Sequence, residues 1–336
     1  MNHPLSIPVV ETTQVGDARR SAVTLAASLH FSEERRGVVA IVVTELATNL
    51  VRHAKGGEII LRPITAGDTL AVEVLASDRG PGIGNLSDAL RDGFSTFGTP
   101  GTGLGAASRL SNAFDIFTSP QGTIVLSQIS SGPAPLQAQK PEVGVICLPV
   151  ASEVACGDAW SVRKTVDART MILVADGLGH GIHAAAASHA AVELFEANVE
   201  LDLPELVTVL HKGLRSTRGA AIAIVELNSG RNELRFVGVG NISGTLIIDG
   251  KTRSTVSHNG TVGAEVHRIK EFNYPWPNDG MLVLHSDGLR SQWNLDAYRG
   301  LRMRHPSIIG AVLYRDFRRD RDDVTVMVIK ASQSQP

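Results

Sequence analysis

The first part of the sequence places three polar side chains four residues apart. Glu45, Asn49 and His53 lie in a segment whose apolar residues recur at helical spacing from Val39 to Leu50. On a helix these positions share one face, so a carboxylate, an amide and an imidazole would point the same way. The pattern is typical of a ligand-binding or catalytic face. For these three residues alone, a solvated stripe on an amphipathic helix is an equally good explanation.

Two glycine-rich motifs follow that segment. The motif DRGPG at residues 78–82 ends an apolar strand, and its two glycines permit a ligand to approach the backbone closely. The motif GTGLG at residues 101–105 stands immediately before a predicted helix, so free backbone N–H groups and a helix N-terminus would face one place, which suits phosphate. Each motif is weak by itself. Their order and spacing after the polar face indicate a nucleotide site.

Four aspartates in the second part stand beside strand ends or turns. They are Asp158 in CGDAW, Asp176 in VADGLGHG, Asp287 in HSDG and Asp322 in DRDDVTV. Taken alone, each is an ordinary turn residue. Together they outline an oxygen-ligand site, and carboxylates without nearby Cys or His pairs suit Mg²⁺ or Mn²⁺ rather than zinc. A pair of cations would require strands distant in sequence to bring these carboxylates together.

Hydrophobic periodicity predicts the elements that position these residues. The first part should contain a helix from Ser32 to His53, strands over 57–63, 69–78 and 122–129, and a helix over 105–113. The second part should contain helices over 180–199 and 203–214, a hairpin turn at 249–250, and strands over 170–175, 220–227, 233–238, 245–248, 281–285 and 324–329. The fold class is therefore α+β, with a β-rich second domain that carries its helices outside.

The composition predicts two domains and argues against several classes of protein. A chain of 336 residues, 43% hydrophobic and 20% charged, is too long for one ordinary domain. The Pro/Ser/Gly/Gln stretch at 131–141 predicts a linker between domains at 1–130 and 142–332. A formal charge of -2 argues against nucleic-acid and anionic-lipid partners. Two cysteines, no charged leader and no apolar run of about 18 residues lead us to expect a cytoplasmic protein without a membrane segment.

The N-terminal motifs, in this order, resemble those of the GHKL or Bergerat-fold ATPases and kinases over residues 9–130. The segment DRGPGIGNLSDALRDGFSTFGTPGTGLGAASRL is most similar to the small serine kinases and anti-sigma factors of bacterial partner-switching systems. The resemblance implies an α/β sandwich of the Bergerat type that binds ATP and Mg²⁺, with residues 84–100 as a lid. It also implies that Glu45 orients or deprotonates an attacking serine hydroxyl.

The same resemblance implies the remaining nucleotide ligands. Asn49 would reach Mg²⁺ and, through it, the ATP phosphates. Asp78 would accept a hydrogen bond from the adenine amino group. Gly80 and Gly82 would leave room for the base. Gly101, Gly103 and Gly105 would bind phosphate through their backbone, and Thr123 would support the adenine site. His53 also matches, and we interpret it as a structural residue at the helix end.

The C-terminal motifs are similar to those of the metal-dependent PPM-type serine/threonine phosphatases, in their sporulation and stress-response branch. The series D-G-x-G-H-G, S-D-G and D-D-x-T carries this resemblance, which covers residues 142–331. It implies a PPM-type β-sandwich flanked by helices and two Mn²⁺ or Mg²⁺ ions that activate a water for attack on phosphorus. Asp176 would bridge the two ions. The coordination shells would be completed by Asp158, Asp287, Asp322 and the backbone carbonyl of Gly177. Asp323 ranks second to Asp322.

Together, the two resemblances imply a bifunctional partner-switching regulator. It would phosphorylate and dephosphorylate Ser or Thr on a STAS-domain antagonist of an anti-sigma factor, and so control a sigma factor or a stressosome-like complex. The alternative is a phosphoserine phosphatase whose N-terminal domain only binds ATP and a protein partner, as a sensor or an anti-sigma tether. Glu45 favours transfer, because a mere nucleotide binder does not need a carboxylate beside the γ-phosphate.

Overall fold

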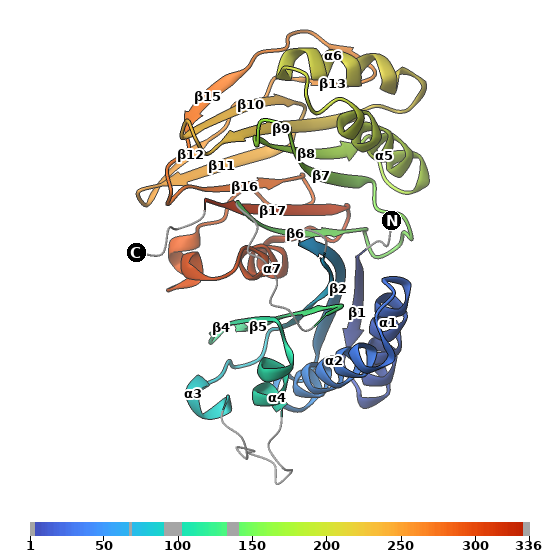
Figure 1. The fold of residues 1–336 in the computed structure, drawn as a ribbon, viewed down its shortest axis with the longest axis vertical. Helices are drawn as coiled ribbons and strands as arrows, with labels where there is room; N and C mark the ends of the chain where they lie inside the picture. Colours follow the sequence, from blue (N-terminus) through green and yellow to red (C-terminus); the bar gives the residue numbers. More distant parts are fainter. Residues whose placement is uncertain (1–3, 67–68, 91–102, 133–140, 332–336) are drawn as a thin grey trace. The chain divides into compact units, whose positions relative to one another are not determined.

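The computed structural model describes residues 4–66, 69–90, 103–132 and 141–331. The chain divides into two compact units, which are drawn in Figure 1. The first comprises Met1–Gln139 with Asn294–Val312, and the second comprises Lys140–Trp293 with Leu313–Pro336. The division falls within helix α7 (Pro306–Phe317), so the sequence of each unit is discontinuous.

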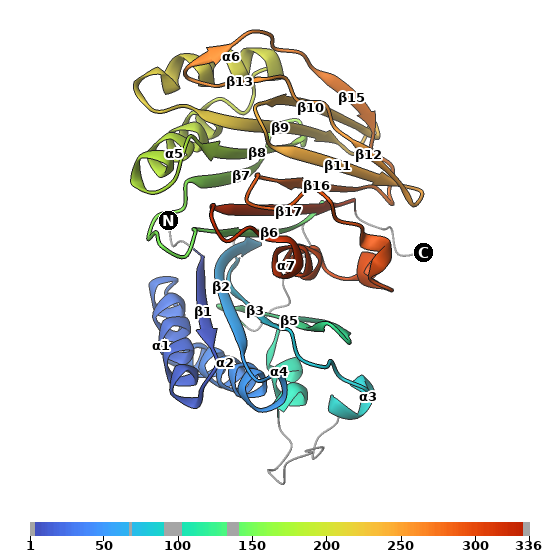
Figure 2. The same cartoon turned by 180° about the vertical axis from the view of Figure 1, so that it is seen from behind.

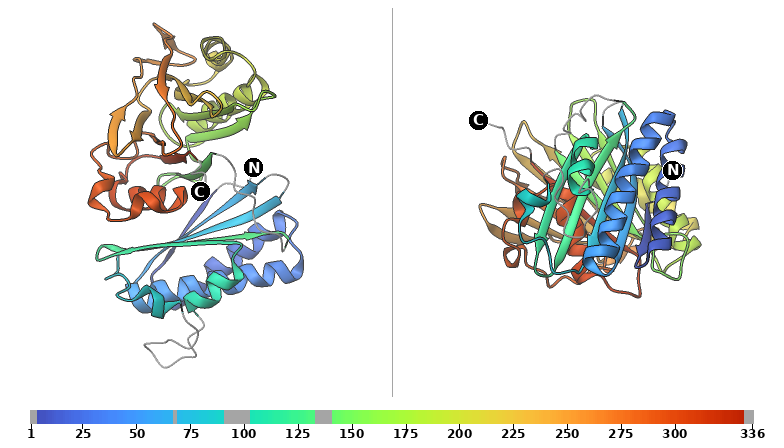
Figure 3. Two further views of the ribbon diagram at one scale, coloured as in Figure 1. Left: turned by 60° about the vertical axis from the view of Figure 1, so that its left-hand side comes forward. Right: turned by 90° about the horizontal axis from the view of Figure 1, so that it is seen from below.

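The first unit is a five-stranded antiparallel sheet with helices packed on one face (Figure 3). The strand order is β1-β2-β3-β5-β4. The strands are β1 (Leu5–Val9), β2 (Gly57–Ala66), β3 (Thr69–Asp78), β4 (Ala113–Ser119) and β5 (Gly122–Ser130). The helices are α1 (Thr12–Ser28), α2 (Glu33–Ala54), α3 (Leu86–Ala89) and α4 (Gly103–Leu110). Buried aliphatic side chains of α1, α2 and the sheet form one core, so this unit is the expected α/β sandwich.

Helix α2 begins and ends where its sequence indicates. The Ser32 side chain accepts a hydrogen bond from the Arg35 amide at 3.2 Å, and Lys55 ends the helix in the left-handed conformation at φ 62°. By length and hydropathy, α2 is the one helix in the described residues that could cross a membrane. Its buried residues, among them Val39, Val42 and Leu46, belong to the core of this unit. A core helix of a globular domain can have the same length and hydropathy as a membrane span.

The second unit is a sandwich of two five-stranded sheets with helices on one outer face (Figures 1 and 2). One sheet has the order β15-β10-β9-β8-β7 and the other has β12-β11-β16-β17-β6. The first contains β7 (Asp158–Lys164), β8 (Thr170–Gly177), β9 (Ala220–Asn228), β10 (Glu233–Val239) and β15 (Phe272–Pro275). The second contains β6 (Glu142–Leu148), β11 (Ser243–Ile248), β12 (Lys251–Ser254), β16 (Met281–His285) and β17 (Val324–Lys330).

Two cores hold this sandwich together. One lies between the two sheets, and the other lies between the β7–β10 sheet and helices α5 (Ile182–Ala197) and α6 (Leu203–Gly213). A short ribbon of β13 (Gly260–Thr261) and β14 (Glu265–Val266) completes the unit, with a 3-10 turn at Leu214–Ser216. The 3-10 turns at Leu295–Ala297 and Leu301–Met303 belong to the first unit. The expected hairpin turn is confirmed, because Asp249 and Gly250 adopt φ values of 48° and 73° between β11 and β12.

Some expected boundaries are wrong, for local reasons. The helix expected at 180–199 begins at Ile182, because Gly181 adopts a φ of 75° that no right-handed helix accommodates. The helix expected at 105–113 runs from Gly103 to Leu110, and Ala113 already belongs to β4. Strands β1, β4, β6 and β7 and helices α1 and α7 were not predicted. The strands are short or carry few apolar residues. The buried residues of α1 and α7 do recur at helical spacing, as in Ala18, Ala22 and Leu25, so these two helices were missed although the pattern is present.

Candidate functional site

Helix α2 presents Glu45 and Asn49 beside the first glycine of helix α4. Both side chains are half-buried on one face of α2. A Cβ atom placed on Gly103 would lie 3.6 Å from Asn49 Oδ1 and 3.8 Å from Glu45 Oε2. The free N–H groups of the first turn of α4 therefore begin next to a carboxylate and an amide, a setting for a phosphate and its cation.

Asp78, at the end of β3, is held by the backbone around it. Its Oδ1 atom accepts hydrogen bonds from the amides of Gly80 at 2.7 Å and Thr123 at 3.1 Å. The Thr123 hydroxyl lies 3.1 Å from the hydroxyl of Thr118, which accepts a hydrogen bond from the Ile83 amide at 2.8 Å. These bonds fix the orientation of the carboxylate, as recognition of an adenine amino group requires.

Gly80 and Gly82 are required by the protein itself, whatever binds beside them. A Cβ on Gly80 would lie 2.9 Å from the Cα atom of Ala54, and one on Gly82 would lie 2.3 Å from the Ser119 carbonyl oxygen. Gly82 also adopts a φ of 79°. The expectation that these glycines make room for a base thus has a second explanation, which is the close packing of this loop on α2 and β4.

One helix connects the two halves of this candidate nucleotide site. Gly80 contacts α2 at Ala54, and Gly103 contacts it at Asn49, five residues earlier and therefore about 7 Å along the axis. Gly105 lies in the first turn of α4 and is buried. Gly101 and residues 91–100 of the lid expected at 84–100 lie outside the described residues. His53 is exposed near the C-terminal end of α2.

In the second unit, Asp158 and Asp176 face each other across the β7–β8 pair. Asp158 is 3% exposed, and its Oδ2 atom accepts a hydrogen bond from the Ser286 hydroxyl at 2.7 Å. Ser286 follows β16 and pairs with Thr325 of β17 through bonds of 2.9 and 3.1 Å. Ser286 therefore links one sheet of the sandwich to a carboxylate on the other.

The remaining two aspartates stand at the ends of β16 and β17. Asp287 Oδ2 accepts a hydrogen bond from the side-chain amide of Asn241 at 2.8 Å. Asp322 Oδ1 accepts one from the Asp323 amide at 3.0 Å. Asn241 is not among the predicted site residues, but this hydrogen bond makes it a positioning residue for Asp287. The signal that could have found it is its place in the Gly240-Asn241 turn directly after β10.

Asp323 has a different environment from Asp322. Its two carboxylate oxygens accept hydrogen bonds of 2.7 Å from the amides of Val150 and Gly157, and it is 3% exposed. Both oxygens therefore hold the loop that precedes β7. Asp322 is less buried than Asp323, so Asp322 is the better candidate for a cation ligand.

Electrostatics show that these carboxylates act on one another. Burial, together with the negative charges of Asp158, Asp287 and Asp322, raises the pKa of Asp176 to about 9. Burial raises the pKa of Asp158 to about 7 in spite of the Ser286 hydrogen bond, and burial and Asp287 raise the pKa of Asp322. Four carboxylates thus repel one another around one end of the sandwich, an arrangement that a dication stabilises.

The donor set fits a hard cation that keeps part of its water shell. Among the described residues, no three His, Cys, Asp or Glu side chains are arranged to hold a metal ion by themselves. Mg²⁺ is commonly bound by one or two carboxylates plus water, so a convergent cage is not required. Gly177 adjoins Asp176, and its backbone is locked: a Cβ there would lie 2.1 Å from the Ala184 carbonyl oxygen.

An arginine that the sequence did not single out lies beside this site. The Arg218 guanidinium, exposed just before β9, lies 3.2 Å from where a Cβ on Gly179 would be. The Leu178 amide donates a hydrogen bond of 3.0 Å to the Gly219 carbonyl oxygen, which ties the two segments together. Arg218 lies outside every motif, so only the pairing of β8 with β9 brings it to the loop after Asp176.

Comparisons with known proteins match the two parts of the chain to two different families. Residues 9–129 match the model of the histidine kinase-like ATPase domain, and residues 166–332 match that of stage II sporulation protein E (SpoIIE). The chain joins a histidine kinase-like ATPase domain to a SpoIIE domain. The SpoIIE domain is a PPM-type serine/threonine phosphatase domain, and the whole has the architecture of a partner-switching regulator.

Two curated relatives divide the chain in the same way. The serine/threonine-protein kinase RsbT of Bacillus subtilis (strain 168) is 28% identical over 116 residues, which are 34% of this chain and 87% of RsbT. The phosphoserine phosphatase RsbX of the same strain is 25% identical over 135 residues, which are 40% of this chain and 67% of RsbX. A crystal structure of RsbX in complex with magnesium shares the fold: it has a TM-score of 0.53 and 21% identity over 58% of this chain and 98% of that chain.

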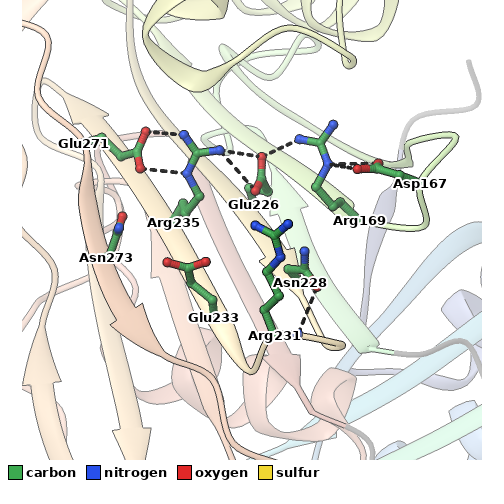
Figure 4. Close-up of a pocket in the computed structure, with 9 residues that line it drawn as sticks. All are labelled: Asp167, Arg169, Glu226, Asn228, Arg231, Glu233, Arg235, Glu271 and Asn273. Atoms are coloured by element: carbon green, nitrogen blue, oxygen red, sulfur yellow. Dashed lines mark hydrogen bonds and ion pairs between the residues drawn. The ribbon is translucent and has the colours of Figure 1, made fainter.

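The SpoIIE domain also has a charged pocket of about 450 Å³, away from its aspartate cluster (Figure 4). Glu226 lies at its centre, with Arg169 Nη1 at 2.6 Å and Arg235 Nη1 at 3.2 Å, and Arg235 also pairs with Glu271 at 2.6 Å. The lining residues are Asp167, Arg169, Glu226, Asn228, Arg231, Glu233, Arg235, Glu271 and Asn273. None is a predicted site residue. Arg169 precedes β8, whereas Asp176 lies near its other end, about 20 Å along the strand.

Proposed function

We propose that the chain sets the phosphorylation level of a serine or threonine on a partner protein, with a kinase site in the ATPase domain and a phosphatase site in the SpoIIE domain. The partner is a STAS-domain antagonist of an anti-sigma factor, which would in turn release or capture a sigma factor or a stressosome-like complex. The observation that carries the proposal is the cluster of mutually repelling aspartates at residues 158, 176, 287 and 322.

In the SpoIIE domain, the four aspartates would hold the cations, and neighbouring side chains orient the aspartates. Asp176 faces Asp158 across β7 and β8, Ser286 fixes one oxygen of Asp158, and Asn241 fixes one oxygen of Asp287. Bound Mn²⁺ or Mg²⁺ would supply Lewis-acid activation of water and neutralise phosphate charge. Arg218 would bind phosphate oxygens from the outer side, since guanidinium suits a phosphate geometrically.

In the ATPase domain, Glu45 is the proposed base and Asn49 the proposed Mg²⁺ ligand. Their side chains lie beside the start of α4, where the free backbone N–H groups of the first turn would bind a phosphate of ATP. Asp78, oriented by Gly80 and Thr123, would accept the adenine amino hydrogen. A carboxylate beside the γ-phosphate favours transfer to a serine hydroxyl over simple nucleotide binding.

Two assays on purified full-length chain separate the proposed activities. With Mn²⁺ and p-nitrophenyl phosphate, wild type should release nitrophenol and Asp176→Asn should lose at least about 100-fold in rate. With labelled ATP and a STAS protein, Asp176→Asn should accumulate phosphoserine, and Glu45→Ala in the same background should not. ATP binding without any labelled protein in the Asp176→Asn background would favour the alternative, in which the ATPase domain only binds nucleotide and partner.

A further inference from the structure

Three large apolar side chains are exposed on the two loops next to the aspartate cluster. Val154 is 100% exposed, Leu178 is 57% exposed and Ile182 is 72% exposed. Single exposed apolar residues are ordinary on protein surfaces. Here, however, they occur on adjoining loops beside a proposed catalytic centre, and exposed apolar groups gathered in this way mark interaction sites.

The two loops are in contact. His180 Nδ1 lies 2.8 Å from Glu153 Oε1, and a Cβ on Gly181 would lie 2.9 Å from the other oxygen of Glu153. Glu153 directly precedes Val154, while His180 lies between Leu178 and Ile182 in the sequence. The three apolar residues therefore lie on or next to two loops that are in contact with each other, and we call these three residues the apolar rim.

The apolar rim is attached to the proposed metal ligands. Val154 lies four residues before Asp158, and Leu178 lies two residues after Asp176. The strand ends that carry these aspartates pair directly, and the Gly177 amide donates a hydrogen bond of 3.0 Å to the Gly157 carbonyl oxygen. A chain segment whose phosphate reached the aspartates would thus pass over one or more rim residues.

We propose that Val154, Leu178 and Ile182 bind the apolar residues that flank the phosphorylated serine or threonine of a protein substrate. The proposal rests on the proposed phosphatase function and specifies its substrate class. Cations bind the phosphate group of any phosphate ester, so discrimination between esters must come from contacts outside the cation site. Glu153 and the neighbouring aspartates disfavour acidic flanking residues, and exposed aliphatic side chains favour aliphatic ones.

The experiment compares three phosphate esters with the full-length chain and Mn²⁺. They are a phosphoserine peptide with leucine and valine on both sides, the same peptide with serines in their place, and p-nitrophenyl phosphate. We expect wild type to prefer the apolar peptide. Val154→Ser, Leu178→Ser and Ile182→Gln should each lower the ratio of kcat/KM for the apolar peptide to that for p-nitrophenyl phosphate by about three- to tenfold.

Val166 supplies the matched control, because it is 95% exposed but lies in the hairpin at the opposite ends of β7 and β8. Val166→Ser should keep the wild-type ratio. Equal kcat/KM values of wild type for the two peptides, or rim variants with unchanged ratios, would overturn the proposal.

Fluorescence anisotropy of the apolar phosphopeptide separates this proposal from the proposed function. Peptide binding that depends on the rim residues, without hydrolysis of any ester, would refute the proposed phosphatase activity but support the apolar rim as a binding site. Hydrolysis of p-nitrophenyl phosphate, with peptide binding that ignores rim substitutions, would refute the rim and retain the phosphatase.

Discussion

At Asp176, burial and four neighbouring carboxylates, those of Asp158, Asp287, Asp322 and Asp323, raise the pKa together. They raise the pKa of this side chain from its ordinary value of 3.8 to about 9, whereas most aspartates in folded proteins stay close to the ordinary value. A raised folded-state pKa means that the metal-free fold binds a proton more tightly than the unfolded chain does. The protonated form of the cluster is therefore the stable form in the absence of cations.

A pH dependence of stability follows. The contribution from the raised pKa of Asp176 is fully present below about pH 4 and is lost as the pH rises towards about 9, so the metal-free protein should lose thermal stability across this range. Mn²⁺ or Mg²⁺ should restore it most strongly at the alkaline end. Melting temperatures in chelator, with and without cation, measure both effects. Asp176→Asn should flatten the profile, and an unflattened profile would contradict the assignment.

Substitutions of Arg218 test whether its guanidinium binds the phosphate group of the substrate. Arg218→Gln should raise KM about tenfold for phosphopeptides and for p-nitrophenyl phosphate alike, because the phosphate group is common to both. Arg218→Lys should recover part of the loss by keeping the charge. Steady-state kinetics of the two variants provide the measurement, and a KM that changes for peptides alone would place Arg218 in protein docking instead.

Sequence motifs predicted candidate ligands, but they did not predict the contacts that orient them. The DDVT motif left Asp322 and Asp323 nearly equivalent, and only the amides of Val150 and Gly157 distinguish them. Asn241 and Arg218 were missed for a related reason, since each reaches the site from a strand end far away in sequence. Long-range strand pairing brings them there, and local patterns do not encode it.

On the scale of elements, the register of β7 with β8 decides whether the aspartates meet. Antiparallel pairing puts Asp158 opposite Asp176, and a shift of one residue would send one side chain to the other face of the sheet. Hydrophobic runs predicted β8, β9 and β16 within a few residues. They did not predict β7, because only three of its seven residues, Ala159, Trp160 and Val162, are apolar, and so the pairing of the two carboxylates was not predictable.

The ion pairs at the opposite end of this sheet should matter for stability. Glu226 is 3% exposed and forms ion pairs with both Arg169 and Arg235. Glu226→Ala would remove the carboxylate that both guanidinium groups share, so it should lower the free energy of unfolding by about 3 kcal/mol or more. Denaturant unfolding of the full chain measures this. Glu233→Ala is the control, because Glu233 lines the same pocket without an ion pair in Figure 4 and should cost under about 1 kcal/mol. Equal losses of unfolding free energy in the two variants would contradict a stabilising role for these ion pairs.

At the scale of the whole molecule, one chain carries two domains whose proposed reactions oppose each other. Composition and motif order were sufficient to predict two domains, their fold classes and their families. The discontinuity of the units was not predictable, because the segment 294–312 lies between two phosphatase motifs, SDG at 286–288 and DDVT at 322–325, yet groups with the first unit. Such grouping depends on tertiary packing, which a single sequence does not reveal.

The most direct test of opposing activities is a time course of phosphoserine on a STAS protein, with full-length chain, limiting ATP and Mn²⁺. We predict that wild type produces a transient phosphoserine signal that decays when ATP is exhausted. Asp176→Asn should convert the transient into stable accumulation, and Glu45→Ala should abolish it. A protein that stays unlabelled with wild type and with Asp176→Asn, in the presence of bound ATP, would contradict the kinase half. A label that persists with wild type after ATP is exhausted would contradict the phosphatase half.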